Sequence, residues 1–399
     1  MIKFAARVGR VKTSPSTLAA QRARELRAAG ADIVSLTTGE PDFATPDHII
    51  DAAFAAARAG QTKYTTVSGT PELKAAIIEK FKRDNDLDYG VENITIGNGG
   101  KHVLFNALMA TVEKGVEVVI PAPYWISYSE IVVLAGGTPK IIPCEADTGF
   151  KLTPDKLEAA ITPATRWLIL NSPSNPSGAV YSHGELAALA EVLLRHPQVA
   201  ILTDDMYEHI LFDGRKFATM AAVCPDLKGR TLTLNGVSKT YAMTGWRIGY
   251  AGGPPELVRE MIKMVSQSTA APSAISQAAS VTALTGPQDF IGNWRASFEE
   301  RRDLAVSMMN QARGITCRSP EGAFYVFPDC SELIGKRTPA GKVLATDKDV
   351  VDYFLEGGVA TVQGSAYGLP GHFRVSFATS PELIRAGIER IQKAAAEVR

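Results

Sequence analysis

The chain has no excess charge of either sign and no long apolar run, and both shortages exclude classes of protein. Its 42 Lys and Arg residues balance 42 Asp and Glu residues, so it lacks the basic surface that attracts nucleic acids or anionic membranes. No 18-residue stretch is both apolar and uncharged, as a membrane span would need. Residues 1–10 lack the apolar segment of a secretory signal. We therefore expect neither a nucleic-acid partner nor a membrane partner.

The sequence is also poor in cysteine, and the few cysteines form no recognisable motif. No Cys-x-x-Cys pair and no His-Glu-x-x-His motif occurs among its 4 cysteines and 6 histidines. A chain of 399 residues buries enough surface to fold without disulfides or a structural metal. Scattered cysteines are typical of reduced, buried thiols in a cytoplasmic protein, and we predict no metal site. The four cysteines are Cys144, Cys224, Cys317 and Cys330.

What the sequence does contain is an alternation of short apolar runs with helical stretches. Continuous Val, Ile and Leu runs are typical of parallel strands that are covered on both faces. The alternation therefore predicts an α/β fold with a mostly parallel sheet. The predicted strands are 93–96, 116–120, 140–142, 166–170, 199–203, 231–234 and 248–251, and the predicted intervening helices include 101–113, 125–134 and 184–195.

The two ends of the chain predict a smaller α+β unit. A helix is predicted over 17–29, capped by Ser16 and ended by Gly30, and a strand over 32–36 follows it. Pro46 and Pro71 each follow a threonine, the pattern of a helix cap and first helical residue. The last third predicts helices over 287–313, 347–356 and 381–398 and strands over 323–326, 358–362 and 373–377. We predict a large domain over 45–290 and a small domain over 1–44 plus 291–399.

A polar segment directly follows each of the predicted strands 166–170, 199–203 and 231–234. Because the carboxyl ends of parallel strands share one edge of a sheet, these polar side chains should converge. A lysine, a carboxylate and two neutral polar groups at one edge suit a site that forms an imine. Turn and capping roles are the alternative for the same residues. The four residues are Asn175, Asp204, Tyr207 and Lys239.

Two further features predict an anion-binding site. The segment 97–101, with the sequence G-N-G-G-K, lies between a predicted strand and a predicted helix. Free N–H groups at the start of a helix bind anions, typically phosphate. The segment matches neither the Walker A loop nor the dinucleotide fingerprint. Arg247, eight residues after Lys239, could pair bidentately with a phosphate, and a tight turn and a surface cation are the alternatives.

Taken together, these motifs resemble the class I aminotransferases of pyridoxal-phosphate fold type I, in particular the bacterial branch of aspartate and prephenate aminotransferases. The resemblance covers essentially the whole chain, in order, and implies pyridoxal 5′-phosphate as the cofactor. It also implies a large domain with a mostly parallel sheet and a smaller α+β domain from both chain ends. The matching motifs are G-E-P-D-F at 39–43, T-K-Y at 62–64, G-G-K at 99–101, P-Y-W at 123–125, N-S-P-S-N-P-S-G at 171–178, D-D-M-Y at 204–207, S-K at 238–239, G-W-R at 245–247 and F-R at 373–374.

The resemblance implies a role for each matching residue on the cofactor side. Lys239 would be the catalytic Schiff-base lysine and would move a proton between the substrate and the cofactor. Asp204 would keep the pyridine nitrogen protonated, so that the ring accepts electrons. Asn175 and Tyr207 would hydrogen-bond the ring oxygen. The other implied cofactor-binding residues are Gly99, Gly100, Lys101, Trp125, Ser238, Arg247 and Tyr64, the last from the other subunit of a homodimer.

The resemblance also implies how the substrate would be held. Arg374 would clamp the α-carboxylate, and Gly39 would contact it through its backbone. Lys101 would bind the distal carboxylate of a dicarboxylic amino acid, and Trp125 and Asn175 would also touch the substrate. The implied reaction is transamination of aspartate and glutamate with 2-oxoglutarate or oxaloacetate by a ping-pong mechanism.

Two departures from the family pattern bear on this expectation. Many relatives have a serine where this chain has Gly236, so one phosphate-binding hydroxyl is missing. Relatives that use prephenate hold its distal carboxylate partly with a lysine near the N-terminus. Thr13 lies where that lysine would align, and Lys12 lies one residue away. We therefore expect prephenate to be a poor substrate.

Other functions on related scaffolds stay open at this point. A prephenate/glutamate aminotransferase is one alternative. A β-lyase or decarboxylase would share the lysine, the aspartate and the arginine, so these residues do not discriminate. A transcription regulator with an aminotransferase-like domain would need a DNA-binding domain, and the 38 residues before Gly39 show no basic recognition helix.

Overall fold

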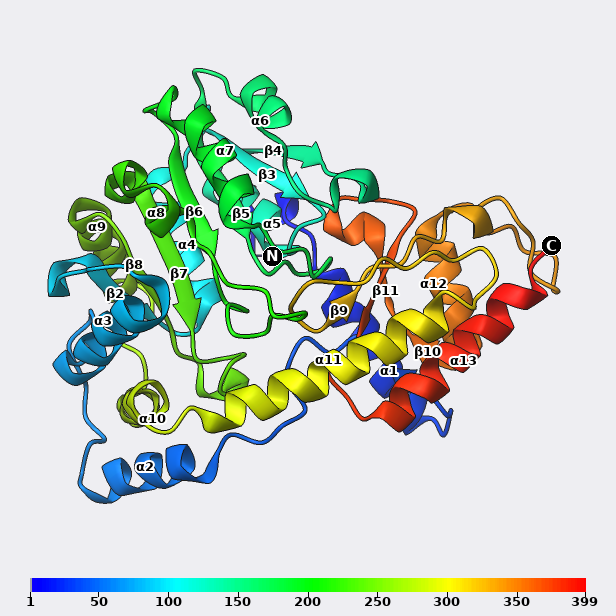
Figure 1. The fold of residues 1–399 in the computed structure, drawn as a ribbon, viewed down its shortest axis with the longest axis horizontal. Coiled ribbons are helices and arrows are strands. Elements are labelled where there is room, and N and C mark those ends of the chain that lie inside the picture. Colours follow the sequence, from blue (N-terminus) through cyan, green and yellow to red (C-terminus); the bar gives the residue numbers. More distant parts are fainter. Residues whose placement is uncertain (1) are drawn as a thin grey trace.

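A seven-stranded sheet forms the largest part of the protein in the computed structural model, which describes residues 2–399 (Figure 1). Within this sheet β8 runs antiparallel to both neighbours, whereas the other pairs are parallel. All seven strands predicted from the sequence are confirmed to within two residues at each end. In spatial order they are β2 (Ile94–Gly97), β8 (Gly249–Gly252), β7 (Thr231–Gly236), β6 (Ala200–Asp204), β5 (Thr165–Asn171), β3 (Glu117–Ala122) and β4 (Thr138–Pro143).

Both faces of this sheet are covered by helices. In β3, Val118 and Ile120 pack with helices α4 (Gly100–Thr111) and α5 (Ser127–Ala135), whereas Val119 points to the other face. Burial on both faces explains why the strands are continuous apolar runs rather than alternating ones. Helix α9 (Pro255–Ser266) joins the first face, and α6 (Pro154–Ala160), α7 (His183–Leu194) and α8 (Met220–Val223) cover the second.

Three helices pack together beside the β2 edge: α2 (Asp47–Arg58), α3 (Pro71–Asn85) and α10 (Ala274–Thr285). The cap predicted for α3 is confirmed, because the Thr70 hydroxyl accepts a hydrogen bond from the backbone of Leu73. The cap predicted for α2 is wrong by one residue. Pro46 itself precedes the helix, and the Thr45 hydroxyl donates to the backbone of Ala242 instead.

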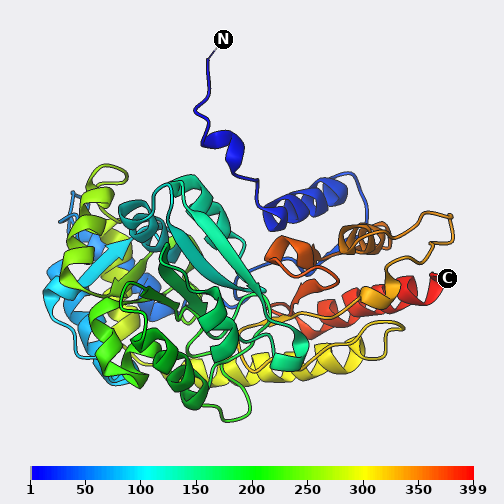
Figure 2. The same ribbon diagram turned by 90° about the horizontal axis from the view of Figure 1, so that it is seen from above.

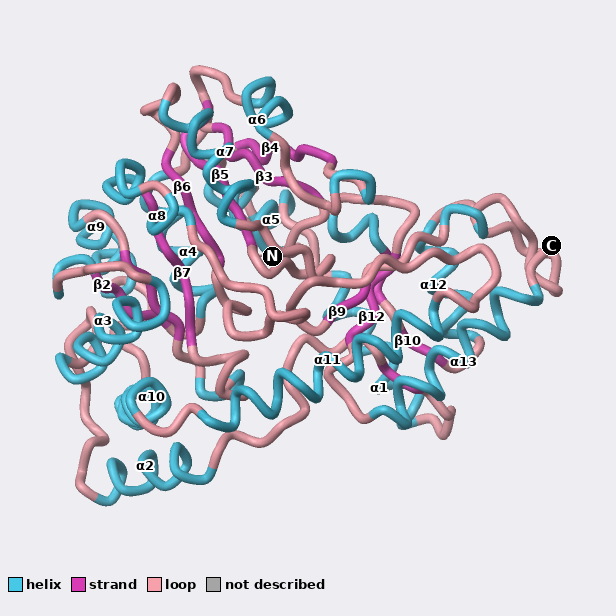
Figure 3. The backbone as a smooth tube through the Cα atoms, in the orientation of Figure 1, coloured by secondary structure: helices cyan, strands magenta, loops and turns pink. Residues whose placement is uncertain are grey.

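The remaining strands are short and form two small sheets (Figure 3). Strands β1 (Val34–Ser35) and β10 (Val359–Ala360) pair in parallel, and β12 (Phe373–Ser376) lies between β11 (Val362–Gln363) and β9 (Tyr325–Val326). The single strand predicted over 358–362 is therefore two strands. The chain changes partner there, from β1 in one sheet to β12 in the other.

Four helices surround these small sheets: α1 (Pro15–Ala28), α11 (Asp289–Met309), α12 (Asp347–Glu356) and α13 (Pro381–Glu397). Helix α11 runs from the large sheet toward the small sheets (Figure 1). The predicted cap of α1 is wrong, because Ser14 precedes the helix and Pro15 takes the first helical position. The Ser16 hydroxyl lies 3.2 Å from the Tyr367 hydroxyl instead.

Residues 2–7 extend away from the body of the molecule (Figure 2), whereas the 3-10 helix Val8–Arg10 contacts α5. Short 3-10 helices complete the structure at Val8–Arg10, Val91–Asn93, Ala146–Thr148, Pro225–Arg230, Thr244–Trp246, Ser331–Leu333 and Gly364–Tyr367. Cys144, Cys317 and Cys330 are buried, and Cys224 is partly exposed. Among residues 2–399 we find no helix with the length and apolar character to cross a bilayer.

The domain boundaries at 44/45 and 290/291 stay a prediction. The second one falls in the first turn of α11, which begins at Asp289 and continues without a break to Met309.

Candidate active site

A cavity of about 570 Å³ lies where the carboxyl ends of the large sheet meet the small sheets. It has two walls. The sheet-edge wall consists of Asn175, Asp204, Tyr207 and Lys239, and the short-strand wall consists of Thr37, Gly39, Tyr325 and Arg374. Five more of the residues predicted from the sequence line the same cavity: Gly100, Lys101, Trp125, Ser238 and Arg247.

Strand register explains why the sheet-edge wall assembles. Asn171 at the end of β5 pairs with Asp204, and Asp204 pairs with Leu234 in β7. Neighbouring parallel strands therefore end side by side, and the segments that follow them start from one edge. Because β8 runs in the opposite direction, its beginning lies at this same edge, where Gly249 pairs with Gly236. Arg247, two residues earlier, consequently reaches the cavity.

Asp204 is buried, and one tyrosine that the sequence analysis missed holds its carboxylate. The Tyr128 hydroxyl donates to Asp204 Oδ2 at 2.6 Å. Burial raises the pKa of Asp204 to about 6, while the hydrogen bond from Tyr128 opposes the rise. Trp125 lies three residues before Tyr128, and their rings pack edge to face. Their spacing of one helical turn was the signal that could have placed Tyr128 in the site.

The neighbouring carboxyl, that of Asp205, belongs to a different environment. Its side chain is 2% exposed and does not line the cavity. Burial raises its pKa well above the ordinary value, with Thr219 as its hydrogen-bonding neighbour. Two adjacent aspartates thus differ in what they face, and only Asp204 is presented to a ligand.

The amine of Lys239 connects the two walls. Its Nζ donates to the carbonyl oxygen of Gly39 at 2.5 Å and lies 5.8 Å from the ring centre of Tyr207. Burial lowers the pKa of Lys239 to about 8, and the nearby carboxylates Glu40 and Asp204 counteract the decrease. A neutral amine is both a nucleophile and a base, and the lowered pKa increases the neutral fraction of Lys239.

Arg374 is held in a fixed orientation at the short-strand wall. Its guanidinium donates to Asn175 Oδ1 at 2.9 Å and to the carbonyl oxygen of Thr37 at 2.7 Å. The side chain is buried, and its Nε has no hydrogen-bond partner within residues 2–399. The rings of Tyr325 and Tyr367 lie 4.5 Å and 5.2 Å from its central carbon. A planar cation with a donor to spare is suited to a carboxylate.

Gly100, Lys101 and Arg247 line the part of the cavity for which the sequence predicts an anion, and Gly99 lies directly behind them, against Arg247. Gly99 has a φ of +85°, and a Cβ on it would lie 2.2 Å from Arg247 Nη2. Only glycine fits there, and the first N–H groups of helix α4 stay available to an anion. Lys101 Nζ lies 5.0 Å from the ring centre of Trp125. Burial, and secondarily the charge of Arg247, lower the pKa of Lys101.

Tyr64 lies outside this cavity. Its side chain is 97% exposed and lines a separate cavity of about 450 Å³ with residues such as Thr70 and Ala278. Within one chain it therefore contacts none of the other predicted cofactor-binding residues. Lys12 also does not line the main cavity, and its backbone N–H donates to Glu130.

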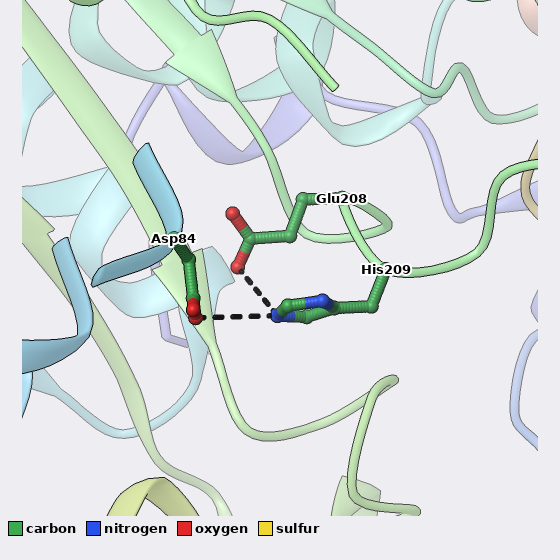
Figure 4. A group of neighbouring side chains, drawn as sticks. All are labelled: Asp84, Glu208 and His209. Carbon is green, nitrogen blue, oxygen red and sulfur yellow. Dashed lines mark ion pairs between the residues drawn. The ribbon is translucent and has the colours of Figure 1, made fainter. Parts of the chain in front are cut away.

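A second group of acidic and histidine side chains lies outside the cavity: Asp84, Glu208 and His209 (Figure 4). His209 Nε2 approaches Asp84 at 3.5 Å and Glu208 at 3.4 Å. Both carboxylates already have cationic partners, because Lys80 pairs with Glu208 and Arg83 pairs with Asp84. Amide groups of Asn85 and Asn235 also donate to Glu208. The group is thus a charge network that joins α3 to the segment after Tyr207.

Comparison with known proteins gives full-length matches. A model of the family described as "Aminotransferase class I and II" matches residues 31–391. An aspartate/prephenate aminotransferase of Cereibacter sphaeroides is 56% identical over 386 residues, 96% of each chain. An aspartate aminotransferase of Rhizobium meliloti is 54% identical over 98% of this chain and 95% of its own. The crystal structure of an aspartate aminotransferase from Rhizobium meliloti superposes with a TM-score of 0.97 at 53% identity, over the whole of both chains. The structure of an aspartate aminotransferase from Thermus thermophilus with maleate superposes with a TM-score of 0.92 at 39% identity, over 99% of this chain and 100% of the other.

Proposed function

This chain belongs to the class I and II aminotransferase family, whose members use pyridoxal phosphate, and we propose that it transfers the amino group of aspartate, and of glutamate, to 2-oxo acids. The observation that carries this proposal is that one cavity holds the Lys239 amine, the Asp204 carboxylate and the Arg374 guanidinium, close enough for both charges to act on the pKa of the amine. The names of both relatives given above include aspartate, and both relatives match nearly the whole length of this chain.

The residues of the cavity fit pyridoxal phosphate. The cofactor has a phosphate, for which Gly99 leaves room beside Arg247, and a basic ring nitrogen, which a carboxylate such as Asp204 can pair with. Gly100 is closely packed as well, since a Cβ there would lie 2.6 Å from the terminal methyl carbon of Met206. When bound, the cofactor supplies the electron sink for bond cleavage at the substrate α-carbon.

We assign the remaining work to the protein side chains. Lys239 Nζ would attach the cofactor and then take up the proton that leaves the substrate α-carbon. A pKa of about 8 keeps a substantial fraction of this amine neutral at physiological pH. Asp204, oriented by Tyr128, would hold the proton on the ring nitrogen. Trp125 would cover the ring, and Asn175 and Tyr207 would hold its oxygen.

Two cations at different places in the cavity support a dicarboxylic substrate. Arg374 presents a planar fork for the α-carboxylate, and Lys101 supplies a point charge for the distal one. Arg24, on helix α1, also lines the cavity and is the competing candidate for the distal charge. The Thermus thermophilus structure with maleate, itself a dicarboxylate, is consistent with two cationic subsites in a related cavity.

Prephenate is the second candidate substrate, because relatives at 56% and 55% identity carry both substrates in their names. The departure at Lys12 and Thr13 led us to expect weak use of prephenate, and that expectation stays a prediction.

We further propose a homodimer in which Tyr64 completes the site of the partner subunit. Its exposure of 97% within one chain supports this role, since a bulky aromatic side chain gains by being covered.

A cytoplasmic location remains the prediction from the scattered cysteines.

Transfer rates for a panel of amino donors with 2-oxoglutarate test the proposal. We expect aspartate and glutamate to exceed alanine and phenylalanine in kcat/KM. Because a charge-assisted contact contributes about 1.5–3 kcal/mol, Lys101→Ala should lower kcat/KM for aspartate by roughly one to two orders of magnitude. Alanine, which lacks a distal carboxylate, serves as the internal control and should lose much less.

Two other outcomes would change the assignment. Equal losses for aspartate and alanine would restrict Lys101 to cofactor binding. A selective loss in Arg24→Gln but not in Lys101→Ala would move the distal charge to helix α1.

A further inference from the structure

Tyr325 is a buried tyrosine that touches both walls of the cavity and has no role so far. It lies in strand β9 and is fully buried. In the register of the small sheet it pairs with Ser376 of β12, the strand that also carries Arg374. The side chain is thus fixed by the same sheet that fixes the carboxylate-binding cation.

The contacts of Tyr325 reach three groups of the site. Its hydroxyl oxygen lies 3.0 Å from the hydroxyl oxygen of Tyr207. The guanidinium carbon of Arg374 lies 4.5 Å from the centre of its ring. A Cβ on Gly39 would lie only 3.2 Å from the Tyr325 hydroxyl, so this hydroxyl lies close to Gly39, whose carbonyl oxygen accepts from Lys239.

We propose that Tyr325 is a positioning residue that couples the substrate side of the cavity to the cofactor side, with its ring under Arg374 and its hydroxyl directing the proton of the Tyr207 phenol. This inference rests on the proposed function, because it takes the Tyr207 phenol to be the donor to the cofactor ring oxygen.

The direction of the shared hydrogen bond follows from the role proposed for Tyr207. Each phenol has a single proton, and the two hydroxyl oxygens lie 3.0 Å apart. When the Tyr207 proton is donated to the cofactor, the Tyr207 oxygen can only accept from Tyr325, so Tyr325 donates. Burial raises the pKa of Tyr325 to about 12, and the charge of Arg374 limits the rise, so the Tyr325 hydroxyl keeps the proton that it donates.

Substrate binding changes this balance. A carboxylate paired with Arg374 neutralises the charge above the Tyr325 ring, so the Tyr325 hydroxyl becomes a weaker donor. A phenol that accepts a strong hydrogen bond is itself a stronger donor. Binding of a carboxylate at Arg374 therefore weakens the hydrogen bond from Tyr207 to the cofactor oxygen, through the two hydroxyls. The hydrogen bond from Arg374 to Asn175 provides a second, direct connection.

The test uses the holoenzyme and two matched variants, Tyr325→Phe and Tyr367→Phe. Both keep a ring beside Arg374 and each removes one hydroxyl. The Tyr367 hydroxyl contacts Ser16 rather than Tyr207, which makes Tyr367→Phe the control. The readout is the pH midpoint of the absorbance of the bound cofactor, with and without saturating maleate, together with the temperature of unfolding.

We expect Tyr325→Phe to raise this midpoint by about half to one pH unit, the equivalent of one ordinary hydrogen bond. A weaker Tyr207 donor stabilises the proton-free form of the bound cofactor less. The shift that maleate causes should shrink in Tyr325→Phe and stay at the wild-type value in Tyr367→Phe. In a Tyr207→Phe background, Tyr325→Phe should produce no further shift, because its effect passes through Tyr207.

Three results would overturn the inference: an unchanged midpoint in Tyr325→Phe, an equal shift in Tyr367→Phe, or a full additional shift in the Tyr207→Phe background. A lower unfolding temperature without a midpoint shift would leave Tyr325 as a packing residue only. The proposed function fails separately, if the wild-type protein binds no pyridoxal phosphate or transfers no amino group.

Discussion

The two walls of the cavity are held in place by different kinds of contact. The sheet-edge wall is set by strand register, since Asp204 ends β6 between two parallel neighbours. The short-strand wall rests on strands of two to four residues, whose ladders contribute few hydrogen bonds. There, side-chain contacts replace the ladder: Arg374 donates to Asn175 and Thr37, and the Tyr325 hydroxyl meets Tyr207. The comparison shows that the second wall is fixed largely by its contacts with the first.

The largest expected effect is that of removing Lys239, which joins the two walls. Lys239→Ala should abolish transamination and the absorbance band of the covalently attached cofactor. The amine of Lys239 lies in the cavity, in contact with the carbonyl oxygen of Gly39 and 5.8 Å from the ring centre of Tyr207. Stopped-flow and steady-state assays of the purified variant provide the measurement. Near-normal turnover would show that another group attaches the cofactor.

The next effect compares two adjacent carboxyls of the sheet-edge wall. Asp204→Asn should keep the cofactor but lose several orders of magnitude in kcat, because a neutral amide cannot hold the ring nitrogen protonated. Asp205→Asn should have a much smaller effect on kcat, since the side chain of Asp205 does not line the cavity, and burial raises the pKa of its carboxyl above the ordinary value. Side-by-side kcat values, with unfolding temperatures as the control for stability, decide the matter. Similar damage in both variants would refute the distinction.

The sheet-edge wall could be predicted from the sequence in physical terms, and the short-strand wall could not. Asp204 and Lys239 follow continuous apolar strands, so their meeting at one edge follows from parallel pairing. Arg374 lies in a four-residue strand without a periodic pattern, and only the resemblance to a family pointed to it. Tyr325 looks like an ordinary core residue of an apolar run, because a sequence pattern does not show which hydroxyl it meets.

Strand direction is another property that periodicity does not report. The run that forms β8 resembles its neighbours in composition, yet it is antiparallel to both. That direction is what brings Arg247 to the cavity. The predicted elements also do not include helices α9 and α10, because both follow the last strand of the large sheet, where the alternation of strands and helices ends. The two incorrect caps were misplaced by one or two residues for different reasons. Helix α2 has Pro46 at the cap position itself, whereas α1 begins two residues earlier than predicted, with Ser14 at the cap and Pro15 at the first helical position.

A pH effect of intermediate size reports on Lys239, the residue that both walls share. Burial lowers its pKa to about 8, so the attacking neutral amine increases with pH up to that value. For cofactor-stripped protein, we expect the rate of covalent pyridoxal-phosphate attachment to rise about 50-fold from pH 6 to pH 8 and then to level off. Stopped-flow absorbance measures the rate, and free lysine is the control. A rate that still climbs tenfold per unit beyond pH 9 would place the pKa near its ordinary value.

The smallest expected effect concerns Tyr64, which belongs to neither wall of its own chain. If the partner subunit uses this hydroxyl to bind the cofactor phosphate, Tyr64→Phe removes one hydrogen bond of about 0.5–1.5 kcal/mol and should raise the cofactor Kd by a few-fold to about tenfold. The same loss should appear in the wild-type protein when it is diluted until sedimentation shows monomers. In that range wild-type and Tyr64→Phe protein should bind cofactor equally, because a monomer has no partner to supply the hydroxyl. The cavity near Tyr64 lies apart from the main one within a single chain, so an intrachain role would predict a Kd that is independent of dilution. A Tyr64→Phe protein with the wild-type Kd as a dimer would contradict the shared site.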